Sequence, residues 1–197
     1  DEYYLTRTEL AIMETYAPQI AAQIGPGVML VEYGSGSSVK TRILLNHLPA
    51  VEAYVPVDIS RDHLQQTSRN LARSYPELEV LPVCADFTTE FDLPIPLTEP
   101  THCAVYFPGS TIGNFAPKEA RRILEQVANL CGTGGGLLIG VDLQKDPAIL
   151  EAAYNDAEGV TAEFNRNLLR RINRELAGDF RLDAFQHVAT YNVAKGR

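Results

Sequence analysis

The 197-residue sequence lacks several features that would place it in a common class of protein. No hydrophobic run reaches the roughly 20 residues of a membrane-spanning helix. The first ten residues have neither the basic region nor the apolar core of a signal peptide. Because 17 Lys and Arg stand against 25 Asp and Glu, the formal net charge of −8 leaves no basic surface for nucleic acid. We therefore expect a small-molecule ligand and no nucleic-acid or membrane partner.

Cysteine is also scarce, and Cys84, Cys103 and Cys131 show no C-x-x-C spacing. An odd, scattered set of thiols argues against a disulfide framework and favours reduced cysteines in a cytoplasmic protein. The four histidines are equally dispersed, so the sequence offers no ligand cluster for a metal ion. We expect a cytoplasmic protein without a metal site.

Strand-like and helix-like segments alternate over the first 140 residues, and 45% of the chain is hydrophobic, enough for one domain with a substantial core. Apolar runs typical of buried parallel strands occupy residues 28–33, 53–59, 78–87, 102–107 and 134–143. Helical spacing of apolar residues is found over residues 10–24, 38–48 and 117–131, and after Ser60. The alternation predicts an α/β fold, with a doubly wound parallel sheet between helices. Thr6 and Glu9 have the spacing of a capping box at the first helix.

The pattern changes after the fifth predicted strand. Residues 143–180 are mostly helical, with Pro147 near the start of one helix and a break at residues 155–159. The next helix has an apolar stripe from Val160 to Leu176, which we expect to pack on the domain. A helical insertion at this point of a parallel sheet is well placed to wall a pocket. Residues 183–193 have the pattern of one more strand.

A glycine-rich corner, "EYGSGSSVKT", follows the first predicted strand. A P-loop would need its second glycine at Val39, and a dinucleotide fingerprint would need its third glycine there. Both patterns therefore fail. What remains is an acidic residue at the strand end followed by G-x-G, namely Glu32, Gly34 and Gly36. S-adenosylmethionine enzymes use this kind of corner for the amino-acid part of the cofactor.

The next two strand ends strengthen this interpretation. Asp58 lies 22 positions after Gly36, where a carboxylate can accept hydrogen bonds from both ribose hydroxyls. Asp86 can accept from the exocyclic amine of adenine, and the ring of Phe87 can cover the base. Each aspartate could instead cap a helix. Taken together, the three strand ends favour S-adenosylmethionine over NAD.

The loop after the fourth predicted strand, "FPGSTIGNF", presents backbone N–H groups and one carboxamide, that of Asn114. It holds no cysteine nucleophile, histidine base or pair of carboxylates. At this loop the sequence resembles the histidine-specific S-adenosylmethionine methyltransferases, which make hercynine in ergothioneine biosynthesis. The matching stretches cover almost the whole chain: "EYYLTRTE", "GSGSSVKTRILL", "PVDIS", "ADFT", "FPGSTIGNF", "LLIGVDLQKD" and "YNDAEGVTAEFNRN".

The resemblance implies a class I methyltransferase fold, which is a Rossmann-like doubly wound sheet in a single domain over residues 1–197. It implies a helical insertion at residues 143–180 that walls the substrate pocket, and an incomplete C-terminal strand hairpin. The family's enzymes extend beyond this chain in both directions, and the residues that bind the imidazole lie in the missing part of the hairpin. We therefore expect a fragment of a longer protein, monomeric at full length.

The resemblance also implies roles for cofactor-binding residues. Gly34 and Lys40 contact the methionine part, with the Lys40 ammonium on its carboxylate. Asp58 holds the ribose, and Asp86 with Phe87 holds the adenine.

For the substrate, the resemblance implies that Asn114 and Tyr154 bind the α-carboxylate of an amino acid. Gly109, through its backbone, and Tyr3 lie near the α-amine. Histidine is the expected substrate, with a tryptophan-derived amino acid or a non-catalytic fragment as alternatives. The sequence does not identify the proton acceptor.

Overall fold

The computed structural model describes residues 3–36 and 38–196, and the chain divides into two compact units. The sheet unit comprises Arg7–Asp142, and the helical unit comprises Leu143–Arg197 together with Asp1–Thr6. Across the described residues, no helix combines the length and the hydrophobicity that crossing a bilayer would require.

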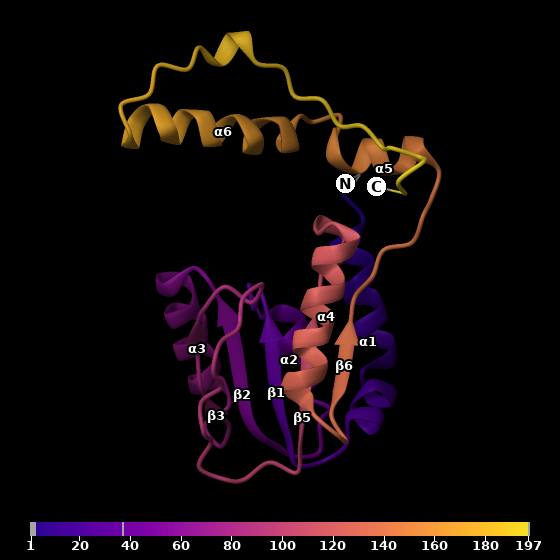
Figure 1. The fold of residues 1–197 in the computed structure, drawn as a ribbon, viewed down its shortest axis with the longest axis vertical. Helices are drawn as coiled ribbons and strands as arrows, with labels where there is room; N and C mark the ends of the chain where they lie inside the picture. Colours follow the sequence, from indigo (N-terminus) through magenta and orange to yellow (C-terminus); the bar gives the residue numbers. More distant parts are fainter. Residues whose placement is uncertain (1–2, 37, 197) are drawn as a thin grey trace. The chain divides into compact units, whose positions relative to one another are not determined.

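The sheet unit contains a parallel sheet with the strand order β3-β2-β1-β5-β6, and β4 also pairs with β2 (Figure 1). Its strands are β1 Val28–Tyr33, β2 Val51–Asp58, β3 Glu79–Val80, β4 Val83–Cys84, β5 His102–Phe107 and β6 Gly136–Ile139. The chain moves outward from β1 to β3 and then returns to the other side of β1. The carboxyl ends of β1 and β5 thus meet at a topological switch point, where open α/β sheets bind ligands.

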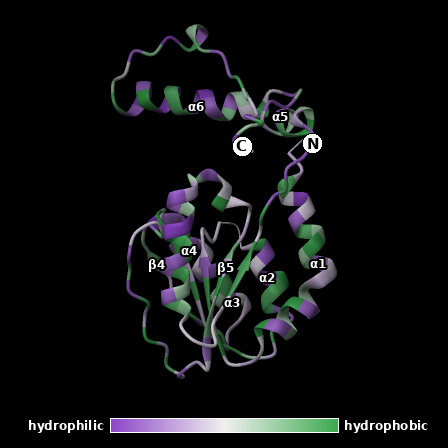
Figure 2. Cartoon of the chain, turned by 45° about the vertical axis from the view of Figure 1, so that its right-hand side comes forward, coloured by the Kyte–Doolittle hydropathy of each residue, from purple (hydrophilic) through white to green (hydrophobic). Residues whose placement is uncertain are grey.

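Helices cover both faces of this sheet, as the alternation in the sequence predicted. They are α1 Leu5–Ile24, α2 Val39–Leu45, α3 Arg61–Ser74 and α4 Pro117–Cys131. One buried cluster joins alternate strand residues to α1, α2 and α3, and a second joins the intervening strand residues to α4. Because each helix packs only one face on the sheet, it carries both hydrophobic and hydrophilic residues (Figure 2). The doubly wound α/β fold is confirmed.

Two local predictions for the sheet unit need correction. α1 already begins at Leu5, so Thr6 lies inside the helix and the predicted capping box of Thr6 and Glu9 is wrong. The predicted third strand is divided into β3 and β4, which pair separately with β2. Leu81 and Pro82 lie between them, and proline has no N–H to donate to a ladder.

The helical unit contains α5 Pro147–Tyr154 and α6 Val160–Glu175, separated by the predicted break. Asp146 accepts from the N–H of Ala148 at 2.8 Å, and Asp156 accepts from the N–H groups of Val160 and Thr161, both at 2.8 Å. These carboxylates satisfy orphan donors at the two helix starts, and hydrogen bonds from Thr161 and Val160 lower the pKa of Asp156 to about 2.

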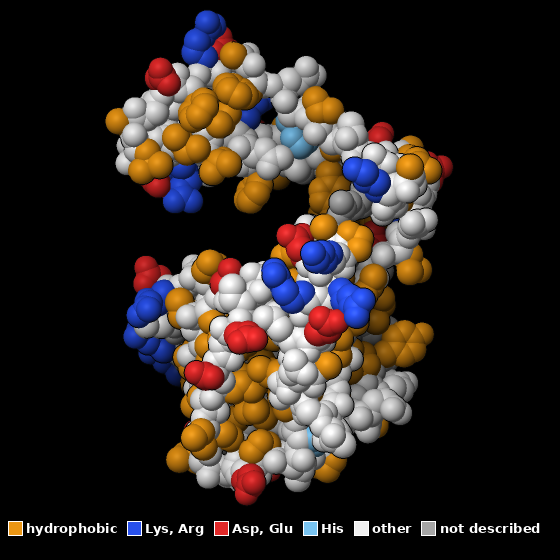
Figure 3. Space-filling view, viewed as in Figure 1, with side chains coloured by type: hydrophobic (Ala, Val, Ile, Leu, Met, Phe, Trp, Pro, Cys, Tyr) orange, Lys and Arg blue, Asp and Glu red, His pale blue; other side chains and the backbone are white. Residues whose placement is uncertain are grey.

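One prediction for the helical unit is wrong. Residues 183–193 form no strand: the described chain there has the short 3₁₀ helix η2 Leu182–Ala184 and irregular backbone. A strand needs a neighbour to complete its backbone hydrogen bonds, and no described segment pairs with this one. Within the helical unit the apolar stripe of α6 has no core to pack into: Val160, Phe164 and Leu168 are exposed. Figure 3 shows hydrophobic side chains at the surface over α6. That the stripe packs on the sheet unit stays a prediction.

Candidate functional site

The glycine corner after β1 forms an open cradle. Gly34 has φ +72° and Gly36 has φ +44°, in the left-handed region that favours glycine. The N–H of Gly34 donates to the carbonyl of Val57 at 2.9 Å, which ties the corner to β2. A Cβ placed on Gly34 would have no atom within 4 Å, so the space beside it is open. The corner therefore has room for a ligand against its backbone.

A buried hydroxyl is a second feature of the corner that suits a ligand. The side chain of Ser35, between the two glycines, is 3% exposed, and its Oγ has no hydrogen-bond partner among the described residues. A buried hydroxyl without a partner is costly unless a ligand or water completes it. The residues of the corner thus fit a polar group of a cofactor, and sequence reasoning did not single out Ser35.

Glu32, predicted as the acidic residue of the corner, is almost fully buried at 2% exposure. Its carboxylate accepts a hydrogen bond from the Oγ1 of Thr41 at 2.6 Å and another from the hydroxyl of Tyr54. Burial raises the pKa of Glu32 to about 7, although the hydrogen bonds from Thr41 and Tyr54 oppose the shift. Glu32 therefore supports the corner from within by joining β1, α2 and β2.

Asp58 ends β2, and the structure places it beside the corner. Its Oδ1 accepts from the N–H of Ser60 at 2.8 Å, before the first turn of α3. From α3 itself, the Nε2 of His63 lies 3.1 Å from the carbonyl oxygen of Gly36. The described hydrogen bond engages one of the two carboxylate oxygens of Asp58. The turn and a ligand can therefore share this side chain.

Asp86 follows β4, whose last residue, Cys84, pairs with Asp58 across the sheet. Its Oδ1 accepts from the N–H of Thr88 at 2.9 Å and from the Oγ1 of Thr88 at 2.7 Å. These hydrogen bonds lower the pKa of Asp86, so it is ionised at neutral pH. The side chain is exposed and caps no helix, but it does stabilise a local turn.

Phe87 belongs to a cluster of aromatic rings on the α4 side of the sheet. Its ring stacks on Tyr33 with centroids 5.1 Å apart and meets Phe107 and Phe115 edge-on at 5.4 and 6.3 Å. Ring contacts of this kind fix the orientation of Phe87. The ring is half-buried, so part of its surface remains accessible.

Lys40, in the first turn of α2, forms an ion pair with Glu9 of α1. The two oxygens of Glu9 also accept from the N–H of Gly109, each at 2.9 Å, in the loop after β5. Glu9 therefore connects two predicted site residues that lie 69 positions apart. Sequence reasoning missed this role, because the only local signal at Glu9 was its spacing from Thr6.

Asn114 lies at the end of a short 3₁₀ helix, η1 Thr111–Asn114, and is exposed. The loop before it is shaped by two residues with positive φ, Gly109 at +79° and Ser110 at +56°. The Oγ of Ser110 accepts from the N–H of Asp142 at 2.9 Å, which ties the loop to the chain beyond β6. The carboxamide of Asn114 is thus presented by a braced loop of the sheet unit.

The helical unit brings the two predicted tyrosines together. The ring of Tyr3 meets that of Tyr154 edge-on, with centroids 5.7 Å apart and an interplanar angle of 86°. Their side chains are 42% and 45% exposed. The carbonyl of Tyr154, at the end of α5, accepts from the Nε2 of His187 at 2.7 Å. Tyr3 and Tyr154 therefore form one local group.

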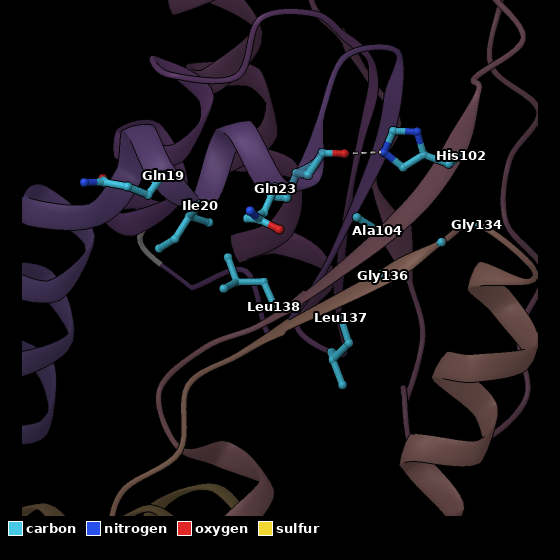
Figure 4. Close-up of a pocket in the computed structure, with 11 residues that line it drawn as sticks. Gln19, Ile20, Gln23, His102, Ala104, Gly134, Gly136, Leu137 and Leu138 are labelled. Atoms are coloured by element: carbon cyan, nitrogen blue, oxygen red, sulfur yellow. Dashed lines mark hydrogen bonds between the residues drawn. The ribbon is translucent and has the colours of Figure 1, made fainter.

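A cavity of about 420 Å³ lies elsewhere in the sheet unit, between α1 and the amino ends of β5 and β6. Figure 4 shows its polar side chains, Gln19, Gln23 and His102, with His102 hydrogen-bonded to the carbonyl of Ile24. Because parallel α/β sheets bind ligands at the opposite, carboxyl ends of their strands, we do not assign the cofactor to this cavity.

Known proteins are similar to the chain over its whole length. Residues 1–197 match the family described as histidine-specific methyltransferase, SAM-dependent. The chain is 42% identical over 199 residues to the histidine N-alpha-methyltransferase of Mycolicibacterium smegmatis, covering all of this chain and 61% of that protein. It is 34% identical over 184 residues to ergothioneine biosynthesis protein 1 of Neurospora crassa, covering 91% of this chain and 21% of that protein.

Among solved structures, the chain is similar to the small RNA methyltransferase HEN1, with a TM-score of 0.53 and 17% sequence identity. The match covers 82% of this chain and 21% of the other. At this identity the likeness concerns the fold alone. The chain itself spans about 61% of the length of its bacterial relative.

Proposed function

Because the chain belongs to the family of histidine-specific, S-adenosylmethionine-dependent methyltransferases, we propose that the protein methylates the α-amine of histidine. Three successive transfers would give hercynine, the trimethylated betaine. The observation that carries this proposal is the family match over residues 1–197, joined to an open corner whose buried Ser35 hydroxyl has no hydrogen-bond partner among the described residues. We also propose that the protein is cytoplasmic and, at full length, monomeric.

The cofactor would lie along the carboxyl ends of β1, β2 and β4. Gly34 and Gly36 leave space for its methionine part, and the ammonium of Lys40 offers a partner for the carboxylate. Asp58 would accept hydrogen bonds from the ribose hydroxyls, and Asp86 with Phe87 would bind the adenine. When bound, S-adenosylmethionine supplies a methyl group on a cationic sulfonium, which is open to in-line attack.

The protein's own residues would align the amino acid for that attack. As the family resemblance implies, the carboxamide of Asn114 and the hydroxyl of Tyr154 would bind the α-carboxylate, and the backbone of Gly109 and Tyr3 would lie near the amine. Holding the nitrogen lone pair on the methyl axis contributes most of the rate, since it replaces a bimolecular encounter by a fixed geometry. The α-ammonium must lose a proton before each transfer, and a nearby positive charge favours the neutral amine.

The test is to incubate the protein with S-adenosylmethionine and histidine and to follow mono-, di- and trimethylated histidine by mass spectrometry. Tryptophan and a prenylated tryptophan serve as comparison substrates. Methylation of histidine supports the proposal. Methylation of a tryptophan substrate alone would replace histidine by the alternative amino acid. Binding of S-adenosylhomocysteine without any methylation would leave only a cofactor-binding fragment.

A further inference from the structure

The ion pair of Glu9 and Lys40 lies in a partly buried position beside the glycine corner. The two side chains are 15% and 20% exposed. Removing charges from water is costly, so a partly buried ion pair is weak evidence for a stabilising role. A cation and an anion held together next to an open cradle instead indicate a ligand that carries both charges.

Besides the Lys40 ammonium, the backbone of two glycines surrounds the Glu9 carboxylate. The N–H of Gly109 donates to both of its oxygens at 2.9 Å. A Cβ on Gly140 would overlap the Oε1 of Glu9 and lie 3.2 Å from the backbone nitrogen of Gly109. Glycine at position 140 therefore leaves the room that this carboxylate occupies.

A second polar group lies on the same side of the sheet, where Tyr106 pairs in register with Glu32 and packs with residues of α1 and α2. The side chain of Tyr106, in β5, is 1% exposed, and its hydroxyl has no hydrogen-bond partner among the residues that the structure describes. Besides burial, the charges of Glu9 and Glu32 raise the pKa of this hydroxyl, which places it in the field of both carboxylates. Such a hydroxyl is available to a ligand or a bound water.

Both charged groups retain hydrogen-bonding capacity. A lysine ammonium has three N–H groups, and the described bond to Glu9 uses one of them. A carboxylate has about four acceptor positions, and the bonds from Lys40 and Gly109 use about three. Adjacent positive and negative groups with spare capacity match the head group of an α-amino acid, in which ammonium and carboxylate are attached to one carbon.

We propose that Glu9 binds the α-ammonium of the cofactor's amino-acid head group, beside the carboxylate already assigned to Lys40. This inference rests on the proposed function, because it takes S-adenosylmethionine as the cofactor. It gives Glu9, a residue of the helix that precedes the sheet, a direct role in recognising the ligand. It also predicts that the protein distinguishes the intact cofactor from nucleosides that lack the head group.

The test compares two ligands by isothermal titration calorimetry. S-adenosylhomocysteine carries the head group, and 5′-methylthioadenosine keeps the nucleoside and sulfur but lacks it. Glu9→Gln should weaken binding of S-adenosylhomocysteine by roughly tenfold or more, since a charge-assisted bond is lost. Binding of 5′-methylthioadenosine should not change. Gly140→Ala, which displaces the Glu9 carboxylate, should give the same pattern, and Glu14→Gln, an exposed position on the same helix, should leave both affinities unchanged.

A third ligand separates the two residues. Decarboxylated S-adenosylhomocysteine keeps the ammonium, so Glu9→Gln should weaken its binding while Lys40→Met should not. Equal weakening of S-adenosylhomocysteine and 5′-methylthioadenosine by Glu9→Gln would overturn the inference and indicate a structural role. An unchanged affinity for S-adenosylhomocysteine would overturn it as well. If the wild-type protein binds no adenosyl ligand, the proposed function fails and this inference with it. If it binds them without methylating histidine, only the substrate proposal fails.

Discussion

The Oγ1 of Thr41 donates a hydrogen bond of 2.6 Å to the carboxylate of Glu32, which fastens α2 to the end of β1 beneath the glycine corner. The hydroxyl of Tyr54 in β2 donates to the same carboxylate oxygen. Three elements that shape the corner, β1, α2 and β2, are thus joined through one buried acidic group. The stability of the fold should therefore depend on whether this group is protonated.

Glu32→Gln should flatten the pH dependence of stability. Folding raises the pKa of Glu32 from 4.5 to about 7, mainly through burial, so the folded chain binds this proton more tightly than the unfolded chain. The resulting stabilisation is fully present below pH 4.5 and is lost as pH rises through 7. Between pH 5 and pH 8 the wild-type free energy of unfolding should fall by about 2 to 3 kcal/mol from this group alone.

Urea denaturation at several pH values measures this effect. The Glu32→Gln protein should lack that part of the decrease, whereas Glu90→Gln, an exposed control, should keep it. Identical pH profiles for wild type and Glu32→Gln would show that Glu32 titrates at the same pH in the folded and unfolded chain.

Asp58→Asn should weaken cofactor binding without weakening the fold. The asparagine Oδ1 can still accept from the N–H of Ser60, so the turn before α3 is retained. The charged acceptor proposed for the ribose hydroxyls is lost, which should lower the affinity for S-adenosylhomocysteine by roughly tenfold. Calorimetry measures the affinity, and thermal unfolding should be unchanged. Asp62→Asn, in the exposed first turn of α3, is the matched control. Equal effects of the two variants would refute a specific role for Asp58.

Asn114→Ala should weaken binding of the substrate and leave binding of the cofactor unchanged. Its exposed carboxamide, on the loop after β5, is proposed to bind the α-carboxylate of histidine. Loss of a hydrogen bond to a charged group should raise the KM for histidine by roughly tenfold, with the same affinity for S-adenosylhomocysteine. Initial rates of methylation measure the first quantity. Asn129→Ala on α4 is the control, and a fall in cofactor affinity would contradict the assignment.

Gly135→Ala and Gly136→Ala should differ sharply in stability although they are neighbours. A Cβ at Gly135 would lie 2.6 Å from the Cβ of Cys131 and 2.7 Å from the carbonyl oxygen of Cys103, so backbone must move. A Cβ at Gly136 would meet nothing within 4 Å. We expect Gly135→Ala to lower the free energy of unfolding by about 1 to 3 kcal/mol and Gly136→Ala to leave it unchanged or slightly raised. Similar values for both would contradict the packing described at the start of β6.

Patterns of short range in the sequence predicted much of this fold. β1 at Val28–Tyr33, β5 at His102–Phe107 and α4 at Pro117–Cys131 have the predicted bounds, because uninterrupted apolar runs and a proline at the helix start identify them. The roles predicted for Tyr3 and Tyr154 came from the family resemblance, and the edge-on contact of their rings was not predicted.

Interactions between distant residues could not be predicted. Glu9 meets Lys40 and Gly109 only after α1 has packed on the sheet, and its spacing from Thr6 indicated a capping box instead. The segment 183–193 has alternation typical of a strand, but a strand forms only where a neighbour is present. Burial likewise made Glu32 a support of the corner, a role that its position at a strand end did not reveal.

The alternation of faces along β1 restricts how its length can change. Glu32 lies on the side of the sheet packed by α1, α2 and α3, while the ring of Tyr33 stacks on Phe87 on the α4 side. Inserting or deleting one residue inside the strand would turn the Glu32 carboxylate toward the aromatic rings and the Tyr33 ring toward Thr41. Insertions can thus be accommodated in the turns that flank this strand, whereas inside it even one residue would exchange the two environments.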